Sequence, residues 1–356
     1  MKKIFLVVAS VFAAHCANAQ NFSKYSNEFM NLGISARNLA MANANVASIN
    51  DATAGYYNPA GLASNYNARQ ISMMHANYFS GLATYNHASV GFRFNHENAC
   101  GLTFLRFGVQ GIPNTLELID NTGNINYEKI RAFNDASTGL LFSYGRQTYN
   151  ESFKVGFNGK IIHRKVGKFA TAWGFGVDIG IQKHIKTWHI GLMARDVTTT
   201  VNTWRYNADA LRTGFTLSDN TIPQKSVEIT LPRYTIGVGK EQQIKNLLSM
   251  LIELNVDITT DGRRNTVYSY KKYSIDPKLG VEFNYANRFY VRTGVNNIQT
   301  DTDVTGATRR IMQPCVGAGI SLKNLTFDYA LMNAGNLSQT YYSNIVSVKL
   351  DFGKIR

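Results

Sequence analysis

The 356-residue sequence predicts an all-β protein: a 14-stranded antiparallel transmembrane β-barrel with an N-terminal plug segment. Three observations support this prediction. Apolar side chains alternate with polar residues or glycine, the alternating segments are long enough to cross a bilayer, and short connections alternate with long ones. The composition agrees, because 19 Tyr, 20 Phe and 29 Gly accompany only 6 Pro and 17% charged residues. The mean hydropathy of −0.19 is too polar for a bundle of membrane helices.

The first 19 residues have the three parts of an export signal. Lys2 and Lys3 form a positive start, residues 4–14 form a short apolar run, and Ala17-Asn18-Ala19 forms a cleavage site. No apolar run reaches the ~18 residues that a spanning helix needs. We expect the signal to be removed, which lowers the formal net charge from +14 by two lysines to +12.

Residues 173–182 show the strand pattern most clearly, with large apolar side chains at every odd position and glycine or polar residues at every even one. One face of such a strand meets lipid and the other faces a lumen. These runs approach the ~9–11 residues that cross a bilayer at a tilt, whereas strands of soluble sandwiches average ~5–6. Fourteen strands are expected, at 70–78, 84–94, 99–109, 134–146, 153–165, 172–183, 187–196, 232–240, 247–259, 275–285, 289–297, 312–321, 325–331 and 342–352.

The connections predict the orientation of the barrel. Links of a few residues alternate with long loops at 110–133, 197–231, 260–274, 298–311 and 332–341. Bacterial outer-membrane barrels have short periplasmic turns and long outside loops, so both termini are expected to be periplasmic. The even strand number allows the sheet to close without an exposed edge.

Residues 100–109 break the alternation. Apolar side chains first occupy even positions, at Leu102 and Phe104, and then odd positions from Leu105 onwards. A β-bulge or wall kink at Phe104-Leu105 would explain the change of phase and would open the wall towards lipid. The alternative is a regular strand whose lumen-facing leucine packs against the plug.

The two cysteines of the mature chain, Cys100 and Cys315, are expected near opposite ends of the wall. The resulting separation of roughly 25 Å exceeds the ~7 Å limit for a disulfide. We predict that both are free thiols.

Residues 20–67 contain no alternating run and are expected to fill the lumen, because a lumen of 14 strands leaks unless something occupies it. Residues 35–42 predict a short Ala-rich helix. Turn chemistry follows, since a proline keeps the preceding residue extended and a glycine permits a sharp turn. The plug residues with this chemistry are Asn58, Pro59, Ala60 and Gly61. The predicted division is a signal peptide at 1–19, a plug at 20–67 and a barrel at 68–356.

The sequence predicts no enzyme, cofactor or metal site. Glu253 and Asp257 lie ~13 Å apart on one strand face, too far to share a proton or a metal ion, and are expected to be solvated or paired with Arg292. Gly174-Phe175-Gly176 and Gly317-Ala318-Gly319 open no helix and are not phosphate loops. The histidines have no metal-ligand spacing.

Positive charge gathers in the predicted outside loops. An exported barrel meets no nucleic acid, so the expected acidic partners are lipopolysaccharide phosphates or the surface of a protein cargo. Replacing Arg263 and Arg264 by serine is predicted to weaken cargo capture without unfolding the protein. The basic residues are Arg131, Arg205, Arg212, Lys225, Arg263, Arg264, Lys271, Lys272, Arg309 and Arg310.

The run from Gly33 to Ala44, then Val46-Ala47, Asp51-Ala52 and the Tyr-Asn-Pro-Ala-Gly-Leu run at 57–62, resembles the N-terminal signature of PorV/PorQ proteins. These are FadL-like outer-membrane barrels of the type IX secretion system of Bacteroidota. The chain departs from the family's usual pattern, with Asn38 in place of alanine and Ala42-Asn43 in place of two glycines.

This resemblance implies a non-enzymatic role in protein secretion. PorV-like members bind the C-terminal sorting domain of secreted cargo at the translocon and carry it to a cell-surface attachment complex, of which PorQ-like members are part. The Asn-Pro-Ala core is shared with FadL proteins generally, so the alternative function is a channel for hydrophobic small molecules. A continuous apolar tunnel past the plug would favour transport, and a closed lumen with an exposed loop surface would favour cargo binding.

Overall fold

The computed structural model describes residues 26–64, 67–119, 122–148, 152–217, 221–222, 225–302, 306–333 and 342–354. The expected export signal lies outside these residues. Within the described part of the chain, no helix is both long and apolar enough to cross a membrane.

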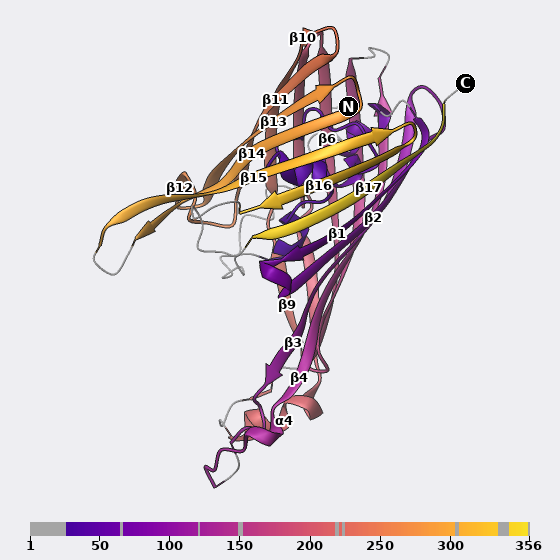
Figure 1. Ribbon diagram of the computed structural model, residues 1–356. Coiled ribbons are helices and arrows are strands. Elements are labelled where there is room, and N and C mark those ends of the chain that lie inside the picture. The colour runs from indigo at the N-terminus through magenta and orange to yellow at the C-terminus, as the bar shows by residue number, and fades with distance from the viewer. Residues whose placement is uncertain are drawn as a thin grey trace.

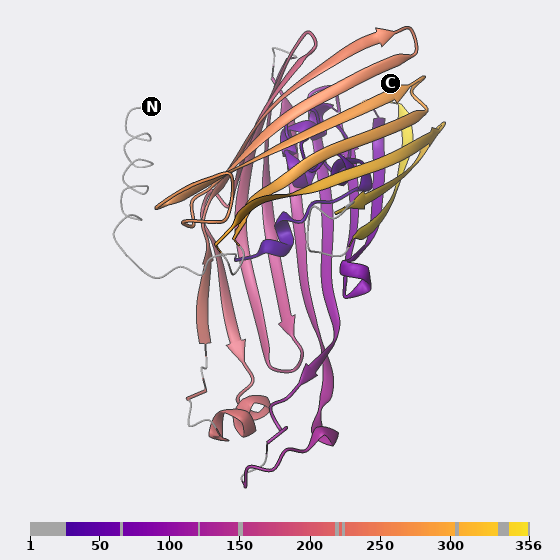
Figure 2. The ribbon, with the colours of Figure 1, turned by 60° about the vertical axis from the view of Figure 1, so that its left-hand side comes forward.

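Fourteen strands form a closed antiparallel barrel, which confirms the predicted fold class (Figures 1 and 2). Neighbours along this series pair with each other, and the first strand pairs with the last, from Asn67↔Lys354 to Asn77↔Asn344. The long loops lie at one end of the barrel, together with the short link at residues 79–82 between β1 and β2. The other short turns lie at the opposite end with the end of the last strand. The strands are β1 (Asn67–Tyr78), β2 (Ala83–Arg93), β3 (Asn98–Asn114), β4 (Arg131–Gln147), β5 (Phe153–Val166), β6 (Ala170–Ile185), β7 (Trp188–Arg195), β10 (Arg233–Lys245), β11 (Leu248–Thr259), β13 (Tyr273–Tyr285), β14 (Phe289–Thr302), β15 (Thr308–Leu322), β16 (Leu325–Met332) and β17 (Ser343–Lys354).

Three short strands extend the wall at the long-loop end. β8 (Thr200–Tyr206) pairs with β6 beyond the end of β7, and β9 (Lys225–Thr230) pairs with β8. Helix α4 (Ala208–Leu217) joins these two strands, and β12 (Tyr268–Tyr270) pairs with β13.

The extensions project as two lobes in Figure 1. The first, called the β3–β9 lobe, comprises the loop-end parts of β3 to β6 with β8, α4 and β9. The second, called the β12–β15 lobe, comprises residues 260–272 with β12 and the loop-end parts of β13 to β15.

The predicted wall kink at Phe104-Leu105 is wrong. β3 keeps an unbroken register with β2 from Ala99 to Val109, while Leu102 and Phe104 face outwards and Leu105 is completely buried on the inner side. The change of phase arises because the inner face of β3 becomes apolar where it packs against residues inside the barrel. The register of β3 shifts instead between Val109 and Ile112, opposite β4, at the base of the β3–β9 lobe.

Cys100 and Cys315 are both free, as predicted. Cys100 pairs across the sheet with Phe92 near the short turns, whereas Cys315 pairs with Met332 at the last position of β16. The strand order therefore keeps the two thiols near opposite ends of the wall.

Residues 26–64, called the internal segment below, lie inside the barrel, where the strands surround them in Figure 2. Their apolar side chains join those of β1 to β5 and of β15 to β17 in one core cluster, which accounts for the burial of an otherwise irregular segment. Four short helices make up about half of the segment: η1 (Glu28–Asn31), α2 (Ala36–Ala40), α3 (Ala54–Tyr57) and η2 (Pro59–Ser64).

Candidate functional site

The internal segment touches the wall directly through its backbone. A Cβ atom at Gly156 on β5 would lie 2.8 Å from the carbonyl oxygen of Pro59, and one at Gly191 on β7 would lie 2.7 Å from the Cα of Ala47. Such distances are shorter than real Cβ contacts, so any side chain at these glycines would displace the segment. Small residues on the inner face are therefore the means by which the wall accepts the segment.

Asn58 anchors the turn that the sequence singled out. Its side chain is fully buried, and Nδ2 donates to the carbonyl oxygens of Val46 at 2.9 Å and Ile181 at 3.0 Å. Its Oδ1 accepts from the backbone N–H of Ala60 at 3.2 Å. Asn58 therefore joins two parts of the segment to β6, and the neighbouring Pro59, Ala60 and Gly61 are buried with it. Whether this arrangement acts as a plug stays a prediction.

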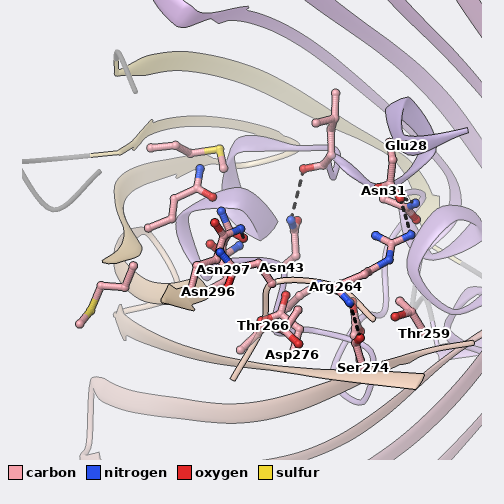
Figure 3. A pocket seen from close by; sticks show the side chains of 18 of the residues that line it. Glu28, Asn31, Asn43, Thr259, Arg264, Thr266, Ser274, Asp276, Asn296 and Asn297 are labelled. Atoms are coloured by element: carbon pink, nitrogen blue, oxygen red, sulfur yellow. Dashed lines mark hydrogen bonds and ion pairs between the residues drawn. The ribbon is translucent and has the colours of Figure 1, made fainter. Parts of the chain in front are cut away.

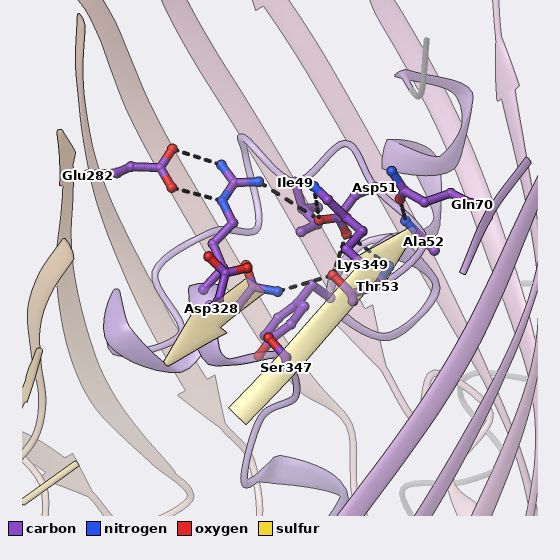
Figure 4. A network of polar contacts seen from close by, with 12 residues as sticks. Ile49, Asp51, Ala52, Thr53, Gln70, Glu282, Asp328, Ser347 and Lys349 are labelled. Atoms are coloured by element: carbon purple, nitrogen blue, oxygen red, sulfur yellow. Dashed lines mark hydrogen bonds and ion pairs between the residues drawn. The ribbon is translucent and has the colours of Figure 1, made fainter. Parts of the chain in front are cut away.

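A buried ion network fixes the other side of the segment (Figure 4). Arg37 donates from Nε to Glu282 of β13 at 2.9 Å, and Glu282 also accepts from Arg292 of β14 at 2.5 Å. Arg37 lies 3.9 Å from Asp51, which in turn lies 3.6 Å from Lys349 of β17. The segment is thereby tied to both flanks of the wall that runs from β13 to β17.

Charge compensation keeps the segment's members of this network ionised. Burial opposes the charge on Arg37, but the carboxylates of Glu282 and Asp51 outweigh it and raise the pKa of the guanidinium above its ordinary value. Burial likewise opposes ionisation of Asp51, but the charges of Lys349 and Arg37 and hydrogen bonds from Thr53 lower the pKa of this carboxyl. The network therefore consists of structural ion pairs and is not a site of proton transfer.

The expectation that Glu253 or Asp257 pairs with Arg292 is wrong. Arg292 lies directly opposite Glu282 in the register of β13 and β14. Its guanidinium therefore pairs with the carboxylate of Glu282. Asp257 pairs with Lys278 at 2.7 Å. Glu253 accepts the backbone N–H groups of Ala47 and Ser48, at 2.8 and 3.1 Å, and holds the internal segment.

A cavity of about 580 Å3 opens at the long-loop end of the barrel (Figure 3). Polar and charged side chains of η1 and of the wall from β10 to β14 line most of it. Arg264 pairs with Glu28 at 2.8 Å and Lys278 with Asp257 at 2.7 Å, whereas Asp276 forms no ion pair with a described residue. Its floor includes Asn31, Leu32 and Asn43 of the internal segment. An apolar side is added by the end of β1 with the residue after it, by β15 and by β16, through Tyr78, Phe79, Ile311, Met312 and Met332.

Much smaller spaces also lie between the internal segment and the wall. Three of them measure about 20 Å3 each. Such a space holds about one water molecule. The cavity at the long-loop end, at about 580 Å3, has room for a larger molecule.

The predicted basic residues fall into different environments. Arg131, Arg205, Arg263, Lys271, Lys272 and Arg310 are exposed on the two lobes, as is Lys225 at the start of β9. Arg212 and Arg309 are exposed but pair with Asp209 and Asp301, at 2.7 and 3.1 Å.

Arg264 is not a free surface charge. Its side chain is only 13% exposed and pairs with Glu28 of the internal segment and with Asp261. These carboxylates outweigh the effect of burial and raise the pKa of Arg264 above its ordinary value. Arg264 therefore ties the β12–β15 lobe to the internal segment, unlike its neighbour Arg263.

Sequence reasoning missed the roles of Arg37, Asp51 and Glu282. An arginine inside an Ala-rich segment was the available signal, because a buried guanidinium requires a carboxylate. Its partner is 245 residues away along the chain, so only the closed barrel identifies it.

No protein-family model matches this chain, and neither does any curated protein sequence. Solved structures do. The toluene transporter TbuX of Ralstonia pickettii is 13% identical, with 90% of this chain and 98% of that chain covered at a TM-score of 0.54. The toluene transporter TodX of P. putida is 10% identical, with coverages of 91% and 99% at 0.55. A FadL homologue of Pseudomonas aeruginosa is 13% identical, with coverages of 87% and 96% at 0.50.

The chain has the fold of FadL-type outer-membrane channels. At such low identities the similarity establishes the fold alone. The fold is consistent with an outer-membrane location, while the orientation of the termini and the likeness to PorV/PorQ proteins stay predictions.

Proposed function

We propose that this chain is a docking barrel of type IX protein secretion, which binds the sorting domains of secreted cargo at its long-loop end and conducts no small molecules. The observation that carries the proposal is the close packing of the internal segment against the wall. The 580 Å3 cavity is lined in part by the internal segment, whose backbone lies so close to β5 and β7 that only glycine fits at Gly156 and Gly191.

The two lobes supply the docking surface. They carry exposed cations that form no ion pair with a described residue, including Arg205, Lys271, Lys272 and Arg310. A folded domain with an acidic surface matches this charge, and long-range attraction speeds its encounter with the barrel. Two separated lobes also offer the wide contact that a folded domain needs.

The assignment to type IX secretion rests on the N-terminal signature. Its residues Arg37, Asp51 and Asn58 all hold the internal segment in place. In this proposal the outward-facing end is the long-loop end, and the partners are the translocon and cargo that has a C-terminal sorting domain.

A second function, a channel for hydrophobic small molecules, is favoured by the structural comparisons. These point towards transport more than towards secretion, because TbuX and TodX are described as toluene transporters. The apolar side of the cavity would contact such a ligand. Passage through the barrel would then require the internal segment to move and the Arg37–Glu282 pair to break.

Two measurements on the purified barrel separate these functions. Docking predicts that translocon or sorting-domain proteins co-purify from the native membrane, and that proteoliposomes take up toluene no faster than empty liposomes. Toluene uptake by the wild-type barrel without co-purifying secretion proteins would overturn the docking proposal and support the channel.

A further inference from the structure

A second cavity, of about 590 Å3, lies in the β3–β9 lobe and is strongly basic. We propose that it binds the phosphate groups of a membrane lipid head group, namely the phosphorylated lipid A of the outer leaflet. Its cations come from four places in the chain: Arg106 on β3, Lys129 and Arg131 around the start of β4, Lys165 on β5, and Lys168 in the turn to β6.

The charge of this cavity is uncompensated. None of the five cations forms an ion pair with a described residue, and Glu117 is the only carboxylate among the lining residues, which leaves five positive charges against one negative charge. Arg164 on the same strand as Lys165 shows the contrast, because it pairs with Glu228 at 3.2 Å. A concentration of unpaired cations selects a ligand with several negative charges.

The cations lie where the apolar outer face of the barrel ends. Arg106 follows Leu102 and Phe104 on the outward face of β3, one step of about 7 Å beyond Phe104. On β5, Lys165 follows His163, whose ring packs against outward-facing Trp173 at 4.5 Å. An exposed tryptophan at the edge of an apolar band marks the level of the lipid head groups.

The cavity also has an apolar side, which distinguishes a lipid from a soluble phosphate. Phe133 and Phe169 line it, with ring centroids 5.1 Å apart in an edge-to-face arrangement. Gly167 allows this packing, since its φ is +48° and a Cβ atom there would lie 2.8 Å from the Phe133 ring. Cations beside aromatic rings suit an amphipathic ligand better than a free phosphate ion.

The inference uses the proposed orientation, with the long-loop end outside, but it does not need the docking of cargo. The test measures binding of bis-phosphorylated lipid A to the full-length mature barrel in detergent. Comparison probes are the same lipid without phosphates, inorganic pyrophosphate and a soluble acidic peptide. The test variant combines three substitutions, Arg131→Gln, Lys165→Gln and Lys168→Gln, in one chain. Its matched control removes the same charge from the other lobe, as Lys271→Gln, Lys272→Gln, Arg310→Gln.

We expect the wild type and the control to bind bis-phosphorylated lipid A equally, and the variant to bind it at least roughly tenfold more weakly, since each cation near an anionic membrane surface contributes measurably. Folding of the variant is checked by the heat-dependent gel mobility of the barrel. Capture of cargo is measured on the same samples, so that loss of lipid binding alone is distinguished from failure of the docking function.

Three outcomes would overturn the inference. Equal binding of the dephosphorylated lipid would show that phosphate is not recognised. Pyrophosphate binding as tight as lipid A binding would identify a soluble anion as the ligand. Capture of the acidic peptide without lipid A binding would assign the cavity to a protein partner.

Discussion

Single residues decide whether the internal segment can sit against the wall. Gly156 and Gly159 illustrate this on one strand, β5. A Cβ at Gly156 would overlap the backbone of Pro59 and Ala60, whereas a Cβ at Gly159 meets nothing within 4 Å. The difference follows from the alternation of strand faces, because one glycine faces the segment and the other faces away.

Gly156→Val is therefore predicted to loosen the internal segment, at a cost of about 1–3 kcal/mol typical of overpacking. The expected result is faster limited proteolysis of the segment and measurable ion conductance in planar bilayers, while the barrel stays folded. Gly159→Val is the control and should behave as the wild type. Equal effects of both variants would argue against direct contact between wall and segment.

A second prediction concerns the stability of the protein without the buried side chain of Arg37. Arg37→Met leaves Asp51 and Glu282 buried with one fewer cation, and removing one member of a buried ion network costs about 3–5 kcal/mol. The exposed pair of Arg212 and Asp209 supplies the comparison, since Arg212→Met should cost less than about 1 kcal/mol. Urea unfolding of both variants in detergent, followed by tryptophan fluorescence, measures the difference.

Asp51 is expected to make the stability of the internal segment depend on pH. The folded protein lowers the pKa of Asp51 below its ordinary value of 3.8, so the ionised carboxylate stabilises the docked segment above that pH. This stabilisation is lost as the pH falls below about 3.8 and through the lower pKa of the folded state. Protection of the segment from pepsin should decline over that range in the wild type. Asp51→Asn should lack this step, and an unchanged decline in that variant would locate the titration elsewhere.

At the scale of elements, two adjacent arginines have different roles because of where the β12–β15 lobe places them. Arg264→Ser should detach the lobe from Glu28 and increase hydrogen exchange in residues 260–275. Arg263→Ser should leave exchange unchanged and weaken only the capture of cargo, since Arg263 is exposed. Replacement without structural effect therefore stays a prediction for Arg263 and is no longer expected for Arg264.

The elements themselves were largely predictable. The alternation of apolar with polar residues predicted the positions of all fourteen wall strands to within a few residues. Lipid on one side of the wall and a polar interior on the other impose this alternation. It failed at Leu105, where the interior is apolar. The added strands β8, β9 and β12 were not foreseen, since outside the bilayer no alternation is imposed on them.

For the whole molecule, the proposed docking depends on the long-range field of the basic lobes. Capture of an acidic sorting domain should weaken as NaCl rises from 0.05 to 0.5 M, because the Debye length shortens from above 10 Å to a few ångströms. Lys271→Glu with Lys272→Glu should reduce capture further at low salt, while Arg212→Gln, which removes a paired charge, should have little effect. Capture that is insensitive to both salt and charge reversal would contradict electrostatic docking.

The sequence by itself determined the strand order, the even strand number, the free cysteines and the presence of an irregular segment before the barrel. These features depend on local periodicity and on the length needed to cross a bilayer, which neighbouring residues encode. Only the tertiary structure decided that Arg37 pairs with Glu282, that Arg264 pairs with Glu28 of the internal segment, and that five cations surround one cavity. Those facts depend on contacts between residues far apart in the chain, which exist only once the barrel has closed around its own N-terminal segment.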